Sequence, residues 1–396
     1  VYGTGYLPGG TYLSDLIDLG SPATVGRIRW REQVVGEELF SNLSVGMRSG
    51  HDDTPILFLQ RVQKGLFTVF IPVTAEEYWE LPRNEQVTLQ EDLENWSPWK
   101  TVENRGLNPA PAPRRFVRFR MEFAGGLFDT RLVERLEFDY LQPPIADTLR
   151  AEVYPRLARA EEPATFRYAV LLGRRGDIHG YDRLEIDSNA PVEDIRNVQV
   201  DGVPVEFEIE SSARDGFRIS LPRIDRDGSL LELTFDIPIF RFGTTFSGRV
   251  FDSRFPTVPQ RLEPGNAVDF GPDDVDELSN LTVEIPKEQI GRLVGEIAFD
   301  SRVVTPNGDG ANDELRVGFN LLQVVREVPV SFELYDLSGR SVASLEAERG
   351  LGPASFTWDG RTADGLRVLP GTYVWVLRVA ADAFEEAHSG VIAVVY

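Results

Sequence analysis

Cysteine is absent from this chain of 396 residues. Its absence excludes thiol catalysis, cysteine-ligated zinc, iron–sulfur clusters and disulfide bonds. Histidine is scarce, because His51, His179 and His388 each stand alone without the spacing of a metal-binding motif. The sequence also lacks a G-x-S-x-G nucleophile elbow and a phosphate-binding P-loop. We therefore expect a protein that is not an enzyme.

Long apolar runs and an excess of basic charge are also missing. No stretch of about 18 apolar residues occurs, so the sequence predicts no membrane-spanning helix. Asp and Glu number 63 against 41 Lys and Arg, which gives a net charge of -22 and a pI near 4.6. A field of this sign repels polyanions, so it disfavours nucleic acid and anionic lipid headgroups as partners.

The chain starts at Val1 without an initiator methionine or a charged and apolar leader. We interpret this start as a mature form whose signal peptide has been removed. The expected location is therefore extracytoplasmic, in the periplasm or on the cell surface.

Short alternating segments separated by turn residues dominate what remains. The chain holds 35 Gly and 26 Pro, and 42% of its residues are hydrophobic, which is enough for several cores. Period-two alternation predicts strands, and helical periodicity is limited to the short segments 74–79 and 86–93. We predict an all-β chain of three consecutive antiparallel β-sandwiches: a jelly-roll-like unit over 1–146, an Ig-like unit over 147–293 and an Ig-like unit over 294–396.

The first predicted unit carries a recognisable order of motifs. It has an opening S-x-x-I-D-L-G strand at Ser14–Gly20, an R-S-G turn at Arg48–Gly50, a W-S-x-W loop at Trp96–Trp99 and an Arg-rich strand at Arg115–Phe123. This order resembles the discoidin-like, galactose-binding-like jelly-roll modules of bacterial surface proteins. Residues 51–95 depart from that pattern and are predicted to be an insertion. We expect Arg115, Arg118 and Arg120 to pair with neighbouring carboxylates, and the alternative is a patch for a partner.

In the second predicted unit, Asp201-Gly202 and Asp227-Gly228 are predicted to close two β-hairpins. The Pro-, Gly- and Asp-rich segment Pro256–Asp276 is expected to be a long surface loop.

Aromatic residues of the first unit are the candidate binding residues. Trp96 and Trp99 share the W-S-x-W loop, and Tyr78 and Trp79 lie in the insertion. Such side chains can stack on a glycan or anchor a protein interface. The competing interpretation is that the loop packs back on the sandwich through its own aromatic rings.

The segment from Val304 to Glu314 is a candidate calcium loop. Asn307, Asp309 and Asp313 could supply oxygen ligands, although Ala311 stands where an EF-hand loop needs an oxygen donor. The alternative is that Asn307-Gly308 and Asp309-Gly310 form consecutive tight turns with positive φ. No other cofactor is expected.

Four further signposts follow that loop in regular order. They are Tyr335-Asp336 with Gly339-Arg340, Trp358-Asp359-Gly360, Asp364-Gly365 and Pro370-Gly371-Thr372-Tyr373. Together with the loop they resemble the Ig-like domain of the flagellar hook-capping protein and the type B C-terminal sorting domain of bacterial secreted proteins. The resemblance covers about residues 303–396 and implies export beyond the inner membrane with a structural or assembly role. We expect Trp358 to be a core residue.

Two functional hypotheses follow from these patterns. The favoured one is an exported structural or scaffold protein that docks on or stabilises a larger extracytoplasmic assembly, with other envelope proteins as partners. It includes an accessory subunit of a membrane complex, such as an energy-transducing or photosynthetic one. The alternative is a carbohydrate- or ligand-binding cell-surface protein that uses the jelly-roll loops.

Overall fold

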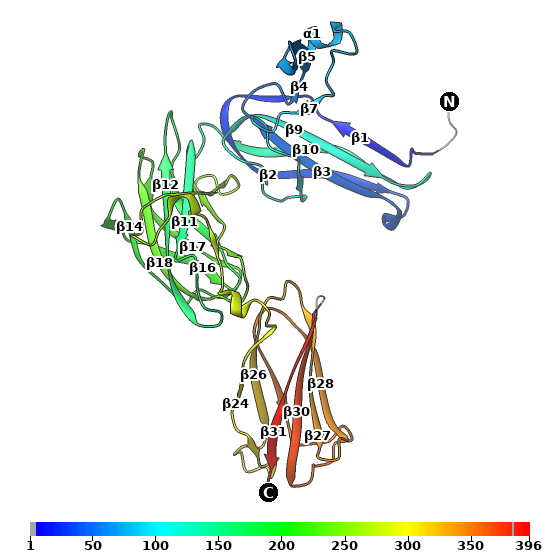
Figure 1. Ribbon diagram of the computed structural model, residues 1–396, viewed down its shortest axis with the longest axis vertical. Helices are drawn as coiled ribbons and strands as arrows, with labels where there is room; N and C mark the ends of the chain where they lie inside the picture. The colour runs from blue at the N-terminus through cyan, green and yellow to red at the C-terminus, as the bar shows by residue number, and fades with distance from the viewer. Residues whose placement is uncertain (1–4, 382–383) are drawn as a thin grey trace.

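The computed structural model describes residues 5–381 and 384–396. The fold is all-β, as predicted, and its antiparallel sheets form three bodies that follow one another along the chain (Figure 1). Each body has its own cluster of buried hydrophobic residues. The inserted segment and the C-terminus lie at opposite ends of the long axis (Figure 1). Among the described residues, no helix is long and apolar enough to cross a membrane.

The first unit is built around a long, bent strand. Its strands are β1 (Gly9–Leu13), β2 (Ile17–Val35), β3 (Asn42–Gly50), β8 (Lys100–Val102), β9 (Arg114–Ala124) and β10 (Thr130–Leu141). The start of β2 pairs with β9, whereas residues 24–35 pair with β10. β9 also pairs with β1 and β3. Alternation along β9 places Val117, Phe119 and Met121 in the core.

The predicted insertion is a small subdomain of its own. It contains β4 (Ile56–Leu57), β5 (Leu59–Lys64), β6 (Phe67–Pro72), α1 (Ala75–Glu80) and β7 (Gln90–Glu91). The helix expected at 74–79 is confirmed, and Thr74 and Glu77 form a capping box at its start. The second helix candidate, 86–93, is wrong. There, Asp92 accepts hydrogen bonds from the backbone of Glu94 and Asn95, which stabilises a turn instead.

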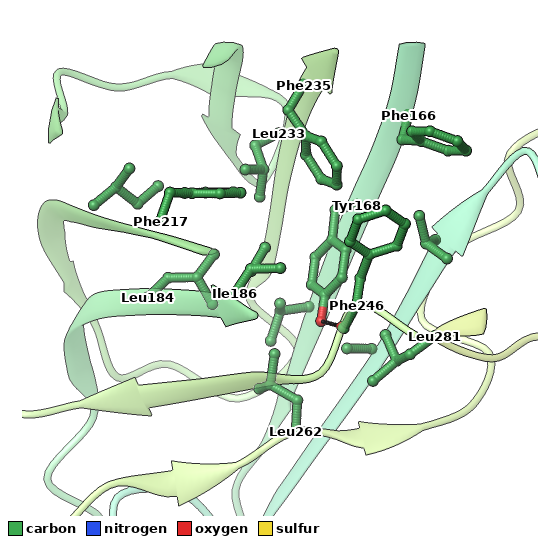
Figure 2. Packing of buried hydrophobic residues seen from close by; sticks show 14 of the residues in the cluster. Phe166, Tyr168, Leu184, Ile186, Phe217, Leu233, Phe235, Phe246, Leu262 and Leu281 are labelled. Carbon is green, nitrogen blue, oxygen red and sulfur yellow. Dashed lines mark hydrogen bonds between the residues drawn. The ribbon is translucent and has the colours of Figure 1, made fainter. Parts of the chain in front are cut away.

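The second unit packs two sheets face to face. One sheet runs in the order β15 (Val203–Pro204), β14 (Asp194–Val200), β18 (Leu230–Pro238), β12 (Pro163–Gly173), β11 (Thr148–Tyr154), β22 (Glu263–Pro264). The other runs β16 (Glu208–Ala213), β17 (Gly216–Ile224), β13 (Tyr181–Asp187), β20 (Gly248–Phe251), β21 (Gln260–Arg261), and β19 (Thr244–Thr245) pairs with β23 (Thr282–Val283). Between the sheets, aromatic rings such as Phe166, Phe235 and Phe246 interlock, and the buried Tyr168 hydroxyl donates to the Phe246 carbonyl (Figure 2).

The two hairpin predictions in this unit have opposite outcomes. Asp201 and Gly202 both have positive φ, as a type I′ turn requires, and they join the paired strands β14 and β15. The hairpin at Asp227-Gly228 is wrong, because β17 before it and β18 after it belong to different sheets. This turn carries the chain across the sandwich, and the Gly228 N–H donates to the Leu172 carbonyl.

The third unit combines a sheet of three strands with a sheet of five. The first is β24 (Val294–Phe299), β26 (Leu315–Leu321), β29 (Gly352–Trp358). The second is β25 (Val303–Val304), β31 (Glu385–Val394), β30 (Gly371–Ala380), β27 (Val328–Asp336), β28 (Ser341–Arg349). Gly339, Gly360 and Gly365 all have positive φ, so these glycines mark turns as expected. Trp358 is buried, as predicted, and its indole N–H donates to the Arg361 carbonyl.

Contacts between the first two units correct the interpretation of Pro256–Asp276 as a surface loop. Gln260 in this segment is 1% exposed. Its side chain accepts hydrogen bonds from the Thr24 hydroxyl and the Ala146 N–H, and it donates to the Ala146 carbonyl. Val258 and Leu262 are buried in the second core. The first half of the segment is therefore part of the second unit, and its Gln260 joins that unit to the first through hydrogen bonds that a buried amide needs.

A second set of contacts joins the second and third units. The Glu161 carboxylate accepts a hydrogen bond from the Glu296 N–H, at 2.9 Å for the nearer oxygen. The Gln323 N–H donates to the Phe240 carbonyl, and the adjacent Leu322 is buried within the second core. The hydrophobic cluster of the second unit thus also contains residues within 141–146, from the predicted first unit, and Leu322, from the predicted third unit. The predicted unit boundaries stay predictions.

Candidate binding surfaces

The W-S-x-W loop lies flat on the outer face of β3. Glycines of β3 make room for its rings, because a Cβ on Gly50 would lie 2.2 Å from the Trp96 ring. Trp96 is 2% exposed and its indole N–H donates to Asp52. Trp99 is half-buried and lies over Gly46, and its N–H donates to Glu91. Solvent therefore reaches Trp99 but hardly reaches Trp96.

Arg48 fills the space between these two rings. Its guanidinium carbon lies 4.6 Å from the Trp99 ring centre and 5.3 Å from that of Trp96. The Arg48 side chain is 3% exposed, and its nearest carboxylate oxygen, on Glu91, lies 3.5 Å away. Burial lowers the pKa of Arg48. Cation–π contact with the two tryptophans partly replaces the water that the guanidinium has lost, and it ties the loop to the sheet.

The arginine row of β9 is largely paired, as expected. Arg115 donates two hydrogen bonds of 2.7 Å to Asp18, and this contact lowers the pKa of Asp18 to about 2. Arg120 forms an ion pair with Glu122 and also lies over the Trp99 ring. Arg118 donates to the backbone carbonyl of Ser14 rather than to a carboxylate.

The two aromatic candidates of the insertion have different environments. Tyr78 is 5% exposed, packs edge-on against Phe58 and donates its hydroxyl hydrogen to the Val87 carbonyl. It therefore belongs to the small core of the insertion. Trp79, the next residue on α1, is 66% exposed and touches Tyr78 through an edge contact. Of this pair, only Trp79 has a large surface free for a ligand or partner.

Sequence reasoning missed three exposed apolar side chains of the insertion. β5 and β6 form a hairpin with Gly65 and Leu66 at its turn. Leu66 is 95% exposed, Phe67 is 76% exposed and Phe70 is 53% exposed. The signal that could have identified this hairpin is the glycine at position 65 between two alternating apolar segments.

The candidate calcium loop is filled by its own hydrogen bonds. Both carboxylate oxygens of Asp313 accept backbone N–H groups, from Gly308 and from Gly310, and these bonds lower the pKa of Asp313. Asn307 and Asp309 each accept the N–H two residues further on. Gly308 and Gly310 have positive φ, which confirms the tight turns. Calcium binding by Asn307, Asp309 and Asp313 stays a prediction.

The described part of the chain contains no group of three or more His, Cys, Asp or Glu side chains arranged to hold a metal ion. Two of the histidines lie in separate settings: His388 pairs with Glu386, and His179 lies 3.5 Å from Asp252.

The first unit has an apolar groove of about 550 Å³ between β1, β9 and β10, lined by Tyr12, Met121 and Leu132 among others.

Comparison with known families identifies the C-terminal region. The family model of the CHU_C type IX secretion signal domain matches residues 298–394. The third unit is thus similar to a C-terminal sorting domain, one of the two resemblances noted from its signposts, and the chain is a secreted or cell-surface protein. No curated protein matches the chain. The discoidin-like resemblance of the first unit stays a prediction.

Similarity to solved structures is distant. Dimeric latent PorU from Porphyromonas gingivalis aligns with 98% of this chain at 13% identity and a TM-score of 0.24, and the chain spans 34% of that protein. The major pilin subunit BcpA of Bacillus cereus aligns with 74% of this chain at 8% identity and a TM-score of 0.23, covering 87% of the pilin. Parabacteroides merdae β-glucuronidase aligns with 59% at 14% identity, a TM-score of 0.19 and 28% coverage of that enzyme. Likenesses this weak carry no argument about function.

Proposed function

We propose that this protein is an exported, non-enzymatic structural protein that docks on or stabilises a larger extracytoplasmic assembly. The observation that carries the proposal is that successive units are connected by direct contacts, which we call joints. Gln260 and Thr24 form a buried hydrogen bond at the first joint, and Glu161 bonds Glu296 at the second. Leu141, Ile145 and Leu322 of the neighbouring units also pack into the second hydrophobic core. Joints with such apolar contacts favour a body that keeps its two ends at a set distance, as a scaffold requires.

The two ends of this body carry different features. The third unit, with its similarity to a type IX secretion signal domain, serves export. The inserted segment of the first unit lies at the other end (Figure 1). It exposes large apolar side chains. Exposed apolar side chains gathered on one element typically mark an interaction site. The insertion is therefore the proposed working end, and accessory subunits of membrane complexes are included among the possible assemblies.

Purification of the tagged full chain from native envelopes after mild cross-linking tests this proposal. A scaffold is expected to co-purify with other envelope proteins in a species much larger than the monomer, with cross-links from residues 51–95. Recovery of the chain as a monomer without cross-linked partners would contradict the proposal.

Ligand binding through the jelly-roll loops is the second candidate. It is favoured by Trp99, whose half-exposed ring has the Arg120 guanidinium over it. The exposed part of the ring can contact a sugar while the charged donor bonds the sugar's hydroxyl groups. Binding to a glycan array that is abolished by Trp99→Ala and retained by Trp79→Ala would support it. Equal binding by the two variants would count against it.

A further inference from the structure

The hairpin of β5 and β6 exposes apolar side chains on both of its faces. Lys64 pairs with Phe67 across the turn, and Arg61 pairs with Phe70 three residues further from it. Because successive strand residues point to opposite faces, Phe67 and Phe70 project on opposite sides. Leu66 extends beyond both at the turn, where Gly65 has a φ of 63°. The hairpin therefore exposes an aromatic ring on each face and a leucine at its turn, while the hydrogen-bonded pair Gln63 and Thr68 lies beside the turn.

The charge of this hairpin is opposite to that of the protein. No Asp or Glu occurs between Asp53 and Glu76, whereas the whole chain carries a net charge of -22. Within that interval the charged residues are Arg61 and Lys64, which are both exposed. Lys64 lies level with Phe67, and Arg61 lies further from the turn. Apolar side chains at a turn flanked by cations match a membrane surface, where hydrocarbon lies below anionic headgroups.

We infer that the β5–β6 hairpin inserts its tip into a lipid surface with anionic headgroups. Leu66 and Phe67 enter the boundary of the acyl chains, and the Lys64 ammonium stays at the level of the phosphates through its flexible stem. Insertion is shallow, because the outer edges of a two-stranded hairpin carry unpaired backbone groups that need water. This inference rests on the proposed envelope location and names the surface that the working end contacts.

The exposure of apolar side chains on opposite faces favours lipid over a protein groove. A groove in a protein covers one face of a hairpin, whereas here Phe67 and Phe70 are exposed on opposite faces. Lipid is an isotropic apolar solvent that surrounds both faces equally. The acidic character of the rest of the chain opposes approach only weakly, since the Debye length at physiological ionic strength is about 8 Å and the insertion projects from the end of the body (Figure 1).

Co-sedimentation of the purified full chain with lipid vesicles tests this inference. Phosphatidylcholine vesicles with and without phosphatidylglycerol are the probes. We expect binding to the anionic vesicles, on the order of tenfold weaker binding to the neutral ones because two cations lose their partners, and a loss of about tenfold or more in a Leu66→Ser, Phe67→Ser double variant. Arg61→Gln with Lys64→Gln should abolish only the preference for anionic vesicles.

The chain contains a matched control for the double variant. Leu39 and Phe40 form another exposed Leu-Phe pair, at 94% and 66% exposure, but two glutamates, Glu37 and Glu38, precede them. Leu39→Ser with Phe40→Ser should therefore bind vesicles as the unmodified chain does. The two Leu-Phe double variants both replace exposed side chains, so the circular dichroism spectrum and the unfolding temperature should remain unchanged in each.

Three results would overturn the inference. The unmodified chain could ignore both kinds of vesicle, the Leu66 and Phe67 variant could bind as well as its control, or both double variants could lose binding equally. Loss of an envelope protein from the Leu66 and Phe67 variant, without vesicle binding by the unmodified chain, would show that the hairpin docks on protein. That result would support the proposed docking function, which is tested by co-purification. It would contradict the inferred contact with lipid, which is tested by vesicle binding.

Discussion

Gly360 and Gly365 are a matched pair of residues in the third unit. Both have positive φ, at 73° and 78°, but a Cβ on Gly360 would lie 2.6 Å from Cβ of Pro306, whereas one on Gly365 would meet nothing within 4 Å. We expect Gly365→Ala to cost about 1 kcal/mol through backbone strain. Gly360→Ala should cost about 2–4 kcal/mol, because overpacking adds to the same strain.

Chemical denaturation of the full chain, followed through the third-unit tryptophans Trp358 and Trp375, measures both costs. A similar loss of unfolding free energy in the two variants would contradict the role given to Pro306. The Trp-Asp-Gly signpost would then depend on turn conformation alone.

Asp336 gives a prediction for the effect of pH. Its carboxylate accepts hydrogen bonds from the Ser338 hydroxyl and from the backbone and side chain of Arg340, which lower its pKa to about 2. A depressed folded-state pKa stabilises the fold above the unfolded-state pKa, and this contribution disappears as the pH falls toward 2. Asp336→Asn keeps the shape but cannot ionise, so it should be less stable than the unmodified chain at pH 6.

The difference in unfolding temperature between the two proteins should shrink as the pH is lowered from about 4 to about 2. A difference that is constant over this range would show that ionisation of Asp336 contributes nothing to stability. NMR titration of the Asp336 carboxyl carbon gives the pKa directly.

At the scale of elements, the loop from Thr305 to Asp313 is expected to fold without a metal. Asp313 and Asp309 already accept backbone N–H groups with oxygens that calcium would need. We therefore expect the unfolding temperature of the full chain to be the same in a chelator and in calcium. A clear fall in the chelator would instead support the calcium site at Asn307, Asp309 and Asp313.

Period-two alternation predicted most strands because side-chain alternation is a local property. β9 is an example: Val117, Phe119 and Met121 share its buried face. Strand partners are not local. The Asp227-Gly228 turn looks like a hairpin turn in sequence, yet Phe217, Ile219 and Leu221 before it and Leu231, Leu233 and Phe235 after it face each other across a sandwich. Alternating apolar residues fit either arrangement, so the sequence could not decide between them.

The candidate surfaces show the same limit. Trp96 and Trp99 were identified from their residue types, but their exposure depends on Gly46, Gly50 and Arg48 of a different strand. Leu66 and Phe67 were missed because apolar residues in alternating segments are normally assigned to a core. The structure was needed to show that no other described part of the chain covers them.

At the scale of the whole molecule, the joints depend on contacts between residues far apart in sequence. Thr24 and Gln260 are separated by 236 residues, and nothing in the Pro- and Gly-rich composition around Gln260 indicates a buried amide. The first and third units are therefore linked to the second through polar contacts that composition and periodicity do not predict.

Gly295 lies against the Glu161 carboxylate at the second joint. A Cβ there would lie 1.4 Å from the nearer carboxylate oxygen of Glu161, so Gly295→Ala forces this flexible side chain away from the Glu296 N–H. We expect little change in unfolding free energy, below about 1 kcal/mol, because an exposed hydrogen bond contributes little. The second and third units should nevertheless move more freely, with faster protease cleavage within 286–294 and a broader distribution of sizes in small-angle X-ray scattering. Gly291→Ala is the control, since a Cβ at Gly291 meets nothing within 4 Å. Equal cleavage and scattering of the two variants would mean that Glu161 does not fix the joint, and that Gln323 and Leu322 hold the units together without it.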